Sequence, residues 1–457
     1  MPEEIVLTAV NVRQANTTMK HSSLTTSVVT SLLLLAALWL ALFCGGCSHT
    51  PAARGADRDA QGRIVLDYWN GFTGPDGKTM EAMVEKFQQD NPDIRVKMQL
   101  IPWGTYYNKL TLALAYGGAP DVFICQAHRM PEFASFDTLR PLKDLYDSAQ
   151  PPLTESQFAA APWRATFYNG VQYALPLDVH PMGMYYNVKL FKQAGIVDAQ
   201  GNAQPPRTWE EFLTDAKKLT KDTTGRGRPD QWGFVITNQE TIFLAMTDQF
   251  GGSILTPDGK HSNLSSPACL AAVNRMHDLI YKYHVAPRPE GINSWLALQQ
   301  GKVAMGLEGI YMLSSLQEQK SLDFAGAPIP QFGPQPGTWG GSHLLCQPRG
   351  LDAERSKAAW RLMRYLSDHS LAWAAGGQVP ARTDVERTAG FQALPVQAQF
   401  AKQLAYVQYA PLVPRDNSLF EFVDPAVEAV LLNLQTPAQA MRDADRRINQ
   451  TLERESQ

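Results

Sequence analysis

Two acidic side chains, Asp178 and Glu308, lie beside apolar segments at positions where they could act on a bound molecule. Two carboxylates that face one glycosidic bond are the requirement of a glycosidase, so this pair defines one candidate activity. Tyr185 and Tyr186 define a second, because adjacent tyrosines bind ferric iron in some receptors. The sequence has no nucleophile motif of the G-x-S-x-G type, which removes one common class of hydrolase.

Aromatic residues beside polar ones favour a different chemistry, the recognition of a neutral sugar. An aromatic face covers the apolar C–H side of a sugar ring, and polar groups nearby bind the hydroxyls. Glycine adds close access to the backbone N–H groups. For Trp69 the alternative is a core position, and for Asp178 it is the capping of a turn. The candidates of this kind are Trp69, Asn70, Thr73, Asp178, His180, Glu308, Tyr311, Trp339, Gly340, Gly341 and Ser342.

The elements that must position these residues alternate in type along the chain. The spacing of apolar residues predicts helices around 80–87 and 107–114. This alternation of strand and helix is typical of an α/β domain. Ligands of such sheets sit beyond the carboxyl ends of the strands, which here are residues 69–73 and 126–129. The strands are predicted over 64–69, 94–100 and 120–125.

Residues 171–196 are the stretch around which the rest of the chain is organised. An apolar strand over 171–177 meets a polar break at 178–183. A second strand over 184–186 then leads into a helix over 188–194. Two strands with one polar break between them favour a crossing point between two lobes.

Length and composition exclude several classes of protein. A chain of 457 residues is too long for one core, so two domains are expected. A net charge of −3 offers no basic surface for nucleic acid. Cys125, Cys269 and Cys346 are far apart and odd in number, which indicates buried residues and supports neither a disulfide framework nor a zinc site. We predict no metal and no cofactor.

The N-terminal part is predicted to direct export. Residues 32–43 are almost wholly apolar but too short to span a membrane comfortably, which is typical of a signal peptide. Lys20 supplies the preceding charge, so we expect translation to begin at Met19 and residues 1–47 to hold the signal. The small residues before Cys47 resemble a lipoprotein cleavage box, and Cys47 is the expected lipidation site, with ordinary signal cleavage or an uncleaved anchor as alternatives. Residues 48–62 are polar and are predicted to be a flexible tether.

Five features in a fixed order, over about Ile64 to Leu452, together give the chain a family resemblance. It resembles family 1 of the bacterial extracellular solute-binding proteins, the sugar and glycerophosphodiester receptors of ABC importers to which maltose-binding protein belongs. The features are Trp69-Asn70-Gly71 with its strand and helix, Gly118-Ala119-Pro120-Asp121-Val122, the run from Leu175-Pro176 through Tyr185-Tyr186-Asn187 to Trp209-Glu210-Glu211, Gly301 to Met305, and Gly340-Gly341-Ser342.

The resemblance implies a two-lobed periplasmic-binding-protein fold of α/β class, with a ligand cleft between lobes that close about a multi-strand hinge. The first lobe would comprise residues 63–177 and 331–370. The second would comprise residues 184–330 and 371–457, with 178–183 as the hinge crossing.

The resemblance also implies ligand contacts on loops that match those of relatives. His128 and Arg129 stand where relatives carry a hydroxyl-binding Asp-Arg pair, and Gln126 is an alternative from the same loop. Tyr106, or instead Trp103, would reach the ligand as a tyrosine does in the glycerophosphodiester receptors. Gln378 lies near a further loop that contacts ligand in relatives.

The expected function is therefore that of a non-enzymatic receptor. It would bind a mono- or oligosaccharide between the lobes and deliver it to the permease subunits of an ABC importer. A glycerophosphodiester is the alternative ligand, and the ferric-ion receptor and the glycosidase are the alternatives from other classes. The protein is expected to be an extracytoplasmic monomer that is held at the membrane by a lipid anchor and does not bind nucleic acid.

Overall fold

Consecutive apolar residues early in the chain form the first of two main sheets. The computed structural model describes residues 55–290, 293–414 and 417–455, which belong to one compact unit over 53–457. Residues 64–70 and 122–126 are mostly buried because helices cover both sides of the sheet. Residues 94–100, at the edge of the sheet, alternate between more buried and exposed positions. The first sheet has five strands, in the order β2 (Ile94–Leu100), β1 (Ile64–Asn70), β3 (Val122–Gln126), β12 (His343–Cys346) and β6 (Ala174–Pro176).

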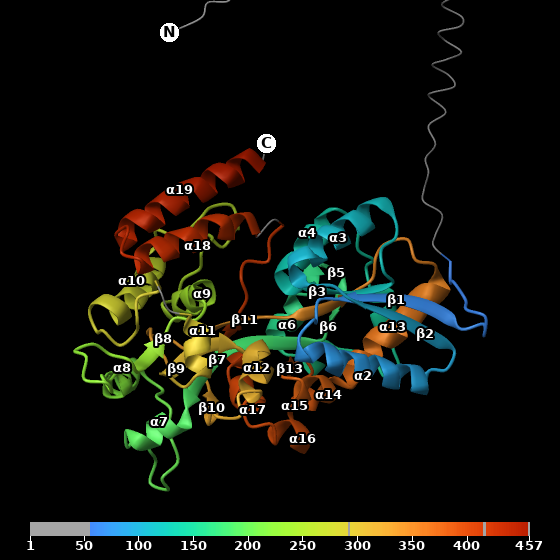
Figure 1. Cartoon of the computed structure of the whole chain (residues 1–457). Coiled ribbons are helices and arrows are strands. Elements are labelled where there is room, and N and C mark those ends of the chain that lie inside the picture. Colours follow the sequence, from blue (N-terminus) through green and yellow to red (C-terminus); the bar gives the residue numbers. More distant parts are fainter. Residues whose placement is uncertain (1–54, 291–292, 415–416, 456–457) are drawn as a thin grey trace, which may run out of the picture. The chain divides into compact units, whose positions relative to one another are not determined.

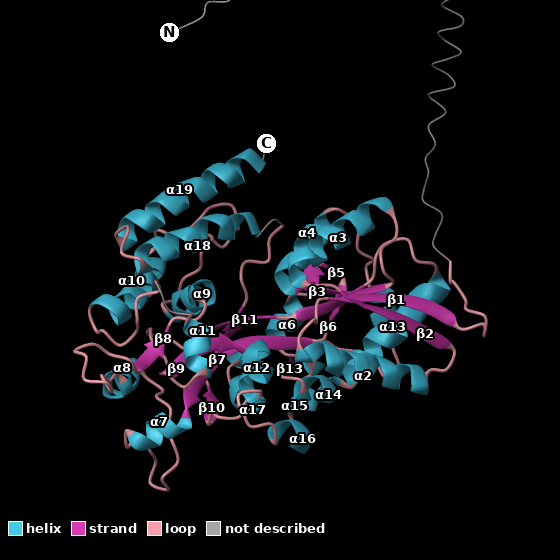
Figure 2. Cartoon of the chain, viewed as in Figure 1, coloured by secondary structure: helices cyan, strands magenta, loops and turns pink. Residues whose placement is uncertain are grey.

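Helices cover both faces of this sheet, as Figure 2 shows. The strands β2, β1 and β3 are parallel, whereas β12 is antiparallel to both of its neighbours. The predicted strand–helix alternation at the start of the chain is confirmed. One face packs against α2 (Pro75–Asp90), α13 (Ala353–Asp368) and α14 (Ser370–Ala375), and the other against α3 (Trp103–Tyr116) and α4 (Met130–Ser135).

The second sheet is built around one long strand, β7 (Asp178–Asn187), which is buried along its whole length. The main path of the sheet has the order β14 (Val407–Gln408), β11 (Thr338–Gly341), β7, β9 (Val303–Gly309) and β8 (Trp232–Val235). Two more strands pair with β7, namely β10 (Phe324–Ala327) and β13 (Val379–Pro380). β7 therefore pairs directly with four of the described strands, namely β11, β9, β10 and β13.

Helices also cover both faces of the second sheet. One face packs against α7 (Val188–Gln193), α8 (Trp209–Leu219), α9 (Gln239–Gln249), α10 (Pro267–Tyr281), α18 (Asn417–Leu431) and α19 (Pro437–Glu455). The other face packs against α11 (Ser294–Gln299), α12 (Leu313–Gln317) and α17 (Gln397–Ala401). Shorter elements complete the fold, among them α5 (Lys143–Asp147), α6 (Ala160–Arg164), α15 (Thr383–Glu386), α16 (Ala389–Gln392) and the hairpin of β4 (Phe167–Tyr168) and β5 (Val171–Gln172).

The predicted break over 178–183 is wrong, because these residues are the first six of the continuous strand β7. Pro181 pairs with Gly340 and Gly183 with Glu308, so pairing from both sides holds the segment extended. Gly183 has a packing reason instead, since a Cβ there would lie 2.2 Å from the ring of Phe400. The change of sheet falls one residue earlier, at Leu177.

The chain passes between the two sheets at further points that differ from the expected boundaries. Residues 340–341 pair with β7 and residues 338–339 pair with β14, both in the second sheet, so the segment 331–370 does not lie wholly with the first sheet. The chain changes sheet at Ser342, between β11 and β12. It changes again after α14, whose Trp373 is buried in the core of the first sheet although it was expected in the second lobe. Figure 1 shows β7 and β11 extending from the second sheet towards the first.

The predicted signal peptide, Cys47 and residues 48–54 lie outside the described residues. The expected tether is wrong for its described part, because Arg58 forms a bridge with Ile64 and an ion pair with Glu354. The N–H of Val65 also donates to the carbonyl of Asp57. Among the helices described, none is both long and apolar enough to cross a membrane.

Candidate functional site

The site lies where β6 continues into β7 and where β11 continues into β12, because these two connections are adjacent. The hydroxyl of Ser342, on the second connection, donates a hydrogen bond to the carbonyl of Asp178, on the first. Both side chains have no exposed surface. We call this place, defined by residues 177–180 and 341–343, the junction.

The Asp178 carboxylate is the polar centre of the junction. It accepts hydrogen bonds from the backbone N–H of His343 (2.9 Å), from His343 Nδ1 (2.8 Å) and from Trp373 Nε1 (2.7 Å). Burial raises the pKa of this carboxyl, but the nearby His343 and His180 outweigh burial and hold the pKa below its ordinary value. Asp178 was expected to contact the ligand. Its carboxylate is instead enclosed, and it orients the ring of His343.

Two histidines lie beside this carboxylate, and a third, His128, lies near both of them. The rings of His180 and His343 are 4.6 Å apart between centroids. His180 Nδ1 lies 3.6 Å from Asp178 Oδ1, which is too long for a hydrogen bond, and burial lowers the pKa of His180. Burial also lowers the pKa of His128 to about 3, with smaller effects from Arg129, His180 and His343. The rings of His128 and His180 therefore favour the neutral form and can accept hydrogen bonds.

Aromatic side chains surround the histidines from both sheets. Trp103 stacks on His343 at 5.8 Å with an interplanar angle of 13°, and Phe72 meets the same ring edge-on at 4.9 Å. Tyr311 and Trp339 lie 6.1 and 6.2 Å from His180. Tyr311 is 39% exposed, and Trp103 and Trp339 are half-buried. The arrangement brings flat apolar faces next to polar ring nitrogens.

Two glycines are present because aromatic rings pack on the backbone. A Cβ at Gly341 would lie 2.3 Å from His180 Nε2, and a Cβ at Gly71 would lie 2.3 Å from the Trp103 ring. Gly340 similarly makes room for Val407. Packing of this kind differs from the expectation that Gly340 and Gly341 offer backbone N–H groups to a ligand.

The structure differs from the prediction that Tyr106 reaches the ligand. Its ring has no exposed surface, and its hydroxyl lies 2.7 Å from the carbonyl oxygen of Ile124 and 3.2 Å from that of Trp69. The residue therefore ties α3 to β1 and β3 inside the core. Its alternative, Trp103, is the residue of α3 that reaches the junction.

Other predicted residues of the first sheet are engaged in local contacts. Lys109 Nζ lies 4.5 Å over the ring of Trp69. Arg129 pairs with Glu132 at 2.7 Å. The remaining contacts place Gln126 Oε1 3.1 Å from the hydroxyl of Tyr107, Asn70 Oδ1 3.1 Å from the N–H of Phe72, Thr73 on the surface and Gln378 in the interior at 1% exposure.

Glu308 is buried on β9, and burial raises its pKa to about 7. It pairs with Gly183, which is five residues along β7 from Asp178. Five strand residues span about 16 Å, whereas glycosidase carboxyls are about 5 to 9.5 Å apart. This spacing does not favour the glycosidase alternative.

Tyr185 and Tyr186 pack inside the second sheet. Tyr185 is 1% exposed and lies 5.1 Å from the ring of Phe400, and Tyr186 lies 5.0 Å from that of Phe191. Burial raises the pKa of both hydroxyls. A phenolate is disfavoured at both positions, so the pair does not favour ferric iron.

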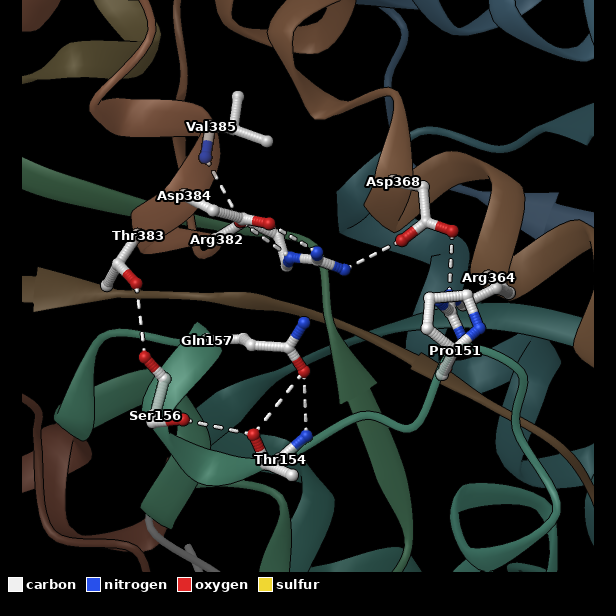
Figure 3. Close-up of polar contacts among 10 residues, drawn as sticks. All are labelled: Pro151, Thr154, Ser156, Gln157, Arg364, Asp368, Arg382, Thr383, Asp384 and Val385. Atoms are coloured by element: carbon white, nitrogen blue, oxygen red, sulfur yellow. Dashed lines mark hydrogen bonds and ion pairs between the residues drawn. The ribbon is translucent and has the colours of Figure 1, made fainter.

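A separate polar cluster surrounds Arg382, close to Gln378 in sequence. Its guanidinium pairs with Asp384 at 2.6 Å and with Asp368 at 2.7 Å. Figure 3 shows the Asp368 carboxylate between Arg382 and Arg364. These contacts tie α15 to the end of α13, which is a structural role.

A cavity of about 630 Å³ lies elsewhere, beside β10. None of the junction residues lines it. Its walls include Pro205, Pro206 and Arg207, and Gln399 of α17. The junction and this cavity are therefore separate features of the structure.

The sequence missed His343, Phe72 and Trp373. His343 follows Ser342 directly, so its position at the start of a buried strand was a usable signal. Trp373 reaches Asp178 across 195 residues of chain, and no local pattern indicates such a contact.

Comparison with known proteins supports this description. Residues 72–369 match the family model described as bacterial extracellular solute-binding protein. An arabinooligosaccharide-binding protein of Bacillus subtilis is 28% identical over 271 residues, which is 58% of this chain and 57% of that protein. The sn-glycerol-3-phosphate-binding periplasmic protein UgpB of Escherichia coli is 23% identical, over 87% of this chain and 94% of its own.

The fold is also that of a solved structure. The sugar-binding protein MalE of Xanthomonas citri superimposes with a TM-score of 0.75 at 22% identity. The match covers 86% of this chain and 98% of that one.

Proposed function

Because the chain belongs to the bacterial extracellular solute-binding protein family, we propose that it is the extracytoplasmic receptor of an ABC importer for a carbohydrate. The ligand binds at the junction and is delivered to the permease subunits. Relatives named as arabinooligosaccharide- and sugar-binding proteins support this class of ligand.

The observation that carries the proposal is the set of aromatic faces around the junction histidines. Trp103 begins α3, which packs on the first sheet, whereas Tyr311 follows β9 and Trp339 lies in β11 of the second sheet. Such faces cover the C–H side of a sugar ring, and the rings of His128 and His343 accept or donate hydrogen bonds to hydroxyls. We propose Trp103, His128, Tyr311, Trp339 and His343 as the contacts.

The connections between the sheets support a closing motion. Each sheet with its helices forms a lobe, and the connections at Leu177 and Ser342 lie side by side. Hinges are a few residues at the ends of elements, as these are. A sugar that touches aromatic faces of both lobes favours the closed form, because only that form makes both sets of contacts.

A neutral ligand is favoured over a glycerophosphodiester. Phosphate recognition needs available cationic or N–H donors, and the guanidinium of Arg129 beside His128 pairs with Glu132. The E. coli relative is named as an sn-glycerol-3-phosphate-binding protein. The ligand screen described below therefore includes phosphate-containing compounds as the second ligand class.

The remaining features of the proposal concern the cell envelope. The chain acts as a receptor without catalysis, as a monomer outside the cytoplasmic membrane. Lipidation of Cys47 would anchor it there, and mass spectrometry of the exported protein tests this step.

A thermal-shift screen over sugars and glycerophosphodiesters tests the function. A ligand that binds only the folded chain at a hundred times its Kd adds about 2.7 kcal/mol to stability. We expect a raised Tm with at least one mono- or oligosaccharide and none with the phosphodiesters. A shift with phosphodiesters alone would replace the ligand class, and no shift with any compound would contradict the receptor proposal.

A further inference from the structure

Three side chains of metal-binding type meet at the junction, and one of them, His343, is also a proposed sugar contact. Asp178, His180 and His343 each offer one ligand atom, and these atoms lie within 4.8 Å of one another. His343 Nδ1 is 2.8 Å from the carboxylate of Asp178, and His180 Nδ1 is 3.6 Å from it. Both rings thus turn the same nitrogen towards one carboxylate.

His180 provides a second observation that points to a bound group. The residue is 5% exposed, yet its Nδ1 has no hydrogen-bond partner. Buried polar atoms nearly always have partners, and an exception requires an explanation. A cation shared with Asp178 and His343 would satisfy this nitrogen.

The surroundings fix the three groups, as the outer shell of a metal site does. Trp373 Nε1 and the backbone N–H of His343 hold the Asp178 carboxylate at 2.7 and 2.9 Å. Gly341 leaves space for the His180 ring, and Trp103 stacks on the His343 ring. These contacts restrict the positions of the three groups.

The donor types select the class of ion. Two imidazole nitrogens and one carboxylate suit Zn²⁺ and similar transition metals, whereas Ca²⁺ and Mg²⁺ require mainly oxygen ligands. Other charged or titratable side chains near the group include His128, Arg129, Asp76, Tyr68 and Tyr409. Arg129 is paired with Glu132, so its charge is partly neutralised.

We propose that Asp178, His180 and His343 form a binding site for one divalent transition-metal ion of the Zn²⁺ class. The ion joins β7 of the second sheet to β12 of the first, and so links the two lobes at their connection. This site goes beyond carbohydrate binding and does not depend on it.

Calorimetric titration of the chelator-treated full chain with ZnCl₂ tests the site, and Co²⁺ absorption reports the ligand set. We expect one equivalent to bind with saturation, and His180→Ala to weaken binding by at least about 100-fold, since losing even an outer-shell partner costs 10–100-fold. Asp178→Asn keeps the shape of the side chain and should also weaken binding. His261→Ala, at an exposed histidine, is the matched control and should leave binding unchanged.

The outcomes separate this site from the proposed function. The proposal is overturned if no saturable equivalent binds, or if His180→Ala binds Zn²⁺ as the unaltered protein does. Circular dichroism confirms that each variant is folded, and an unfolded His180→Ala is replaced by Asp178→Asn in the comparison. Sugar binding by the chelator-treated protein is measured in parallel, so a failed metal site and a failed receptor give different results.

Discussion

At the scale of single residues, burial decides which predicted side chains remain candidates. Tyr106 and Asp178 have the right chemistry for a ligand but no exposed surface. Trp103, Tyr311 and Trp339 keep surface at the junction. Residue type indicates what a side chain can bind, whereas exposure depends on contacts that are distant in sequence.

Glu308 gives a pH-dependent prediction. Burial raises its pKa to about 7 from 4.5, so the folded state holds a proton that the unfolded state has lost between these values. Stability from this group is therefore lost as the pH rises from 4.5 to about 7. Relative to Glu308→Gln, the unaltered protein should lose on the order of 3 kcal/mol over this range.

Urea unfolding at several pH values measures the difference. Glu318→Gln, at an exposed position, is the control and should show no such trend. If the stability difference between Glu308→Gln and the unaltered protein does not change with pH, the raised pKa is wrong.

At the scale of elements, local signals placed most helices and strands correctly. The Thr208–Glu211 spacing predicts a capping box, and both of its hydrogen bonds are present at the start of α8. The strand β7 was missed in part, because Pro181 and Gly183 usually end strands. Pairing with β11 and β9, which lie far along the chain, holds these residues in the sheet.

The cap of α8 is testable by substitution. Thr208→Ala removes the acceptor of the Glu211 N–H and should lower the free energy of unfolding by about 1 kcal/mol. Thr214→Ala, at an exposed position inside the same helix, should be neutral or slightly stabilising because alanine favours helix. Chemical denaturation compares the two, and an equal loss in both would contradict the role of the cap.

At the scale of the whole molecule, the family motif around Asp121 is explained by a buried ion pair. Asp121 and Arg355 have no exposed side-chain surface, and Arg355 Nη2 donates to Asp121 Oδ2 at 2.8 Å. Arg355 Nη1 also donates to the carbonyl of Gly55 at 2.9 Å. The pair therefore joins β3, α13 and the start of the described chain.

Removal of one partner of the Asp121–Arg355 ion pair should strongly destabilise the folded protein. Arg355→Met leaves the Asp121 carboxylate buried without its counter-ion, which costs about 3–5 kcal/mol. Arg361→Met on the same helix breaks the exposed pair with Asp93, for which at most about 1 kcal/mol is expected. Denaturant unfolding of both variants checks the contrast, and equal losses would contradict it.

The two-lobed architecture and the receptor class could be predicted from the sequence, because the strand–helix pattern and the ordered motifs extend over most of the chain. The site could be predicted only in part. Asp178 and His180 were named, but the contacts that gather them with His343 and Trp373 join segments that are 163 to 195 residues apart. No periodicity encodes such contacts.

The most direct test of the receptor is calorimetry with the sugar that the thermal-shift screen identifies. Tyr311→Ala should weaken binding about tenfold or more, equivalent to about 1.4 kcal/mol, because it removes an aromatic face at the junction, while the Tm without ligand changes little. Tyr116→Ala removes a tyrosine that is 85% exposed on α3 and should bind as the unaltered protein does. Unchanged affinity in Tyr311→Ala, or equal weakening in both variants, would contradict a carbohydrate site at the junction.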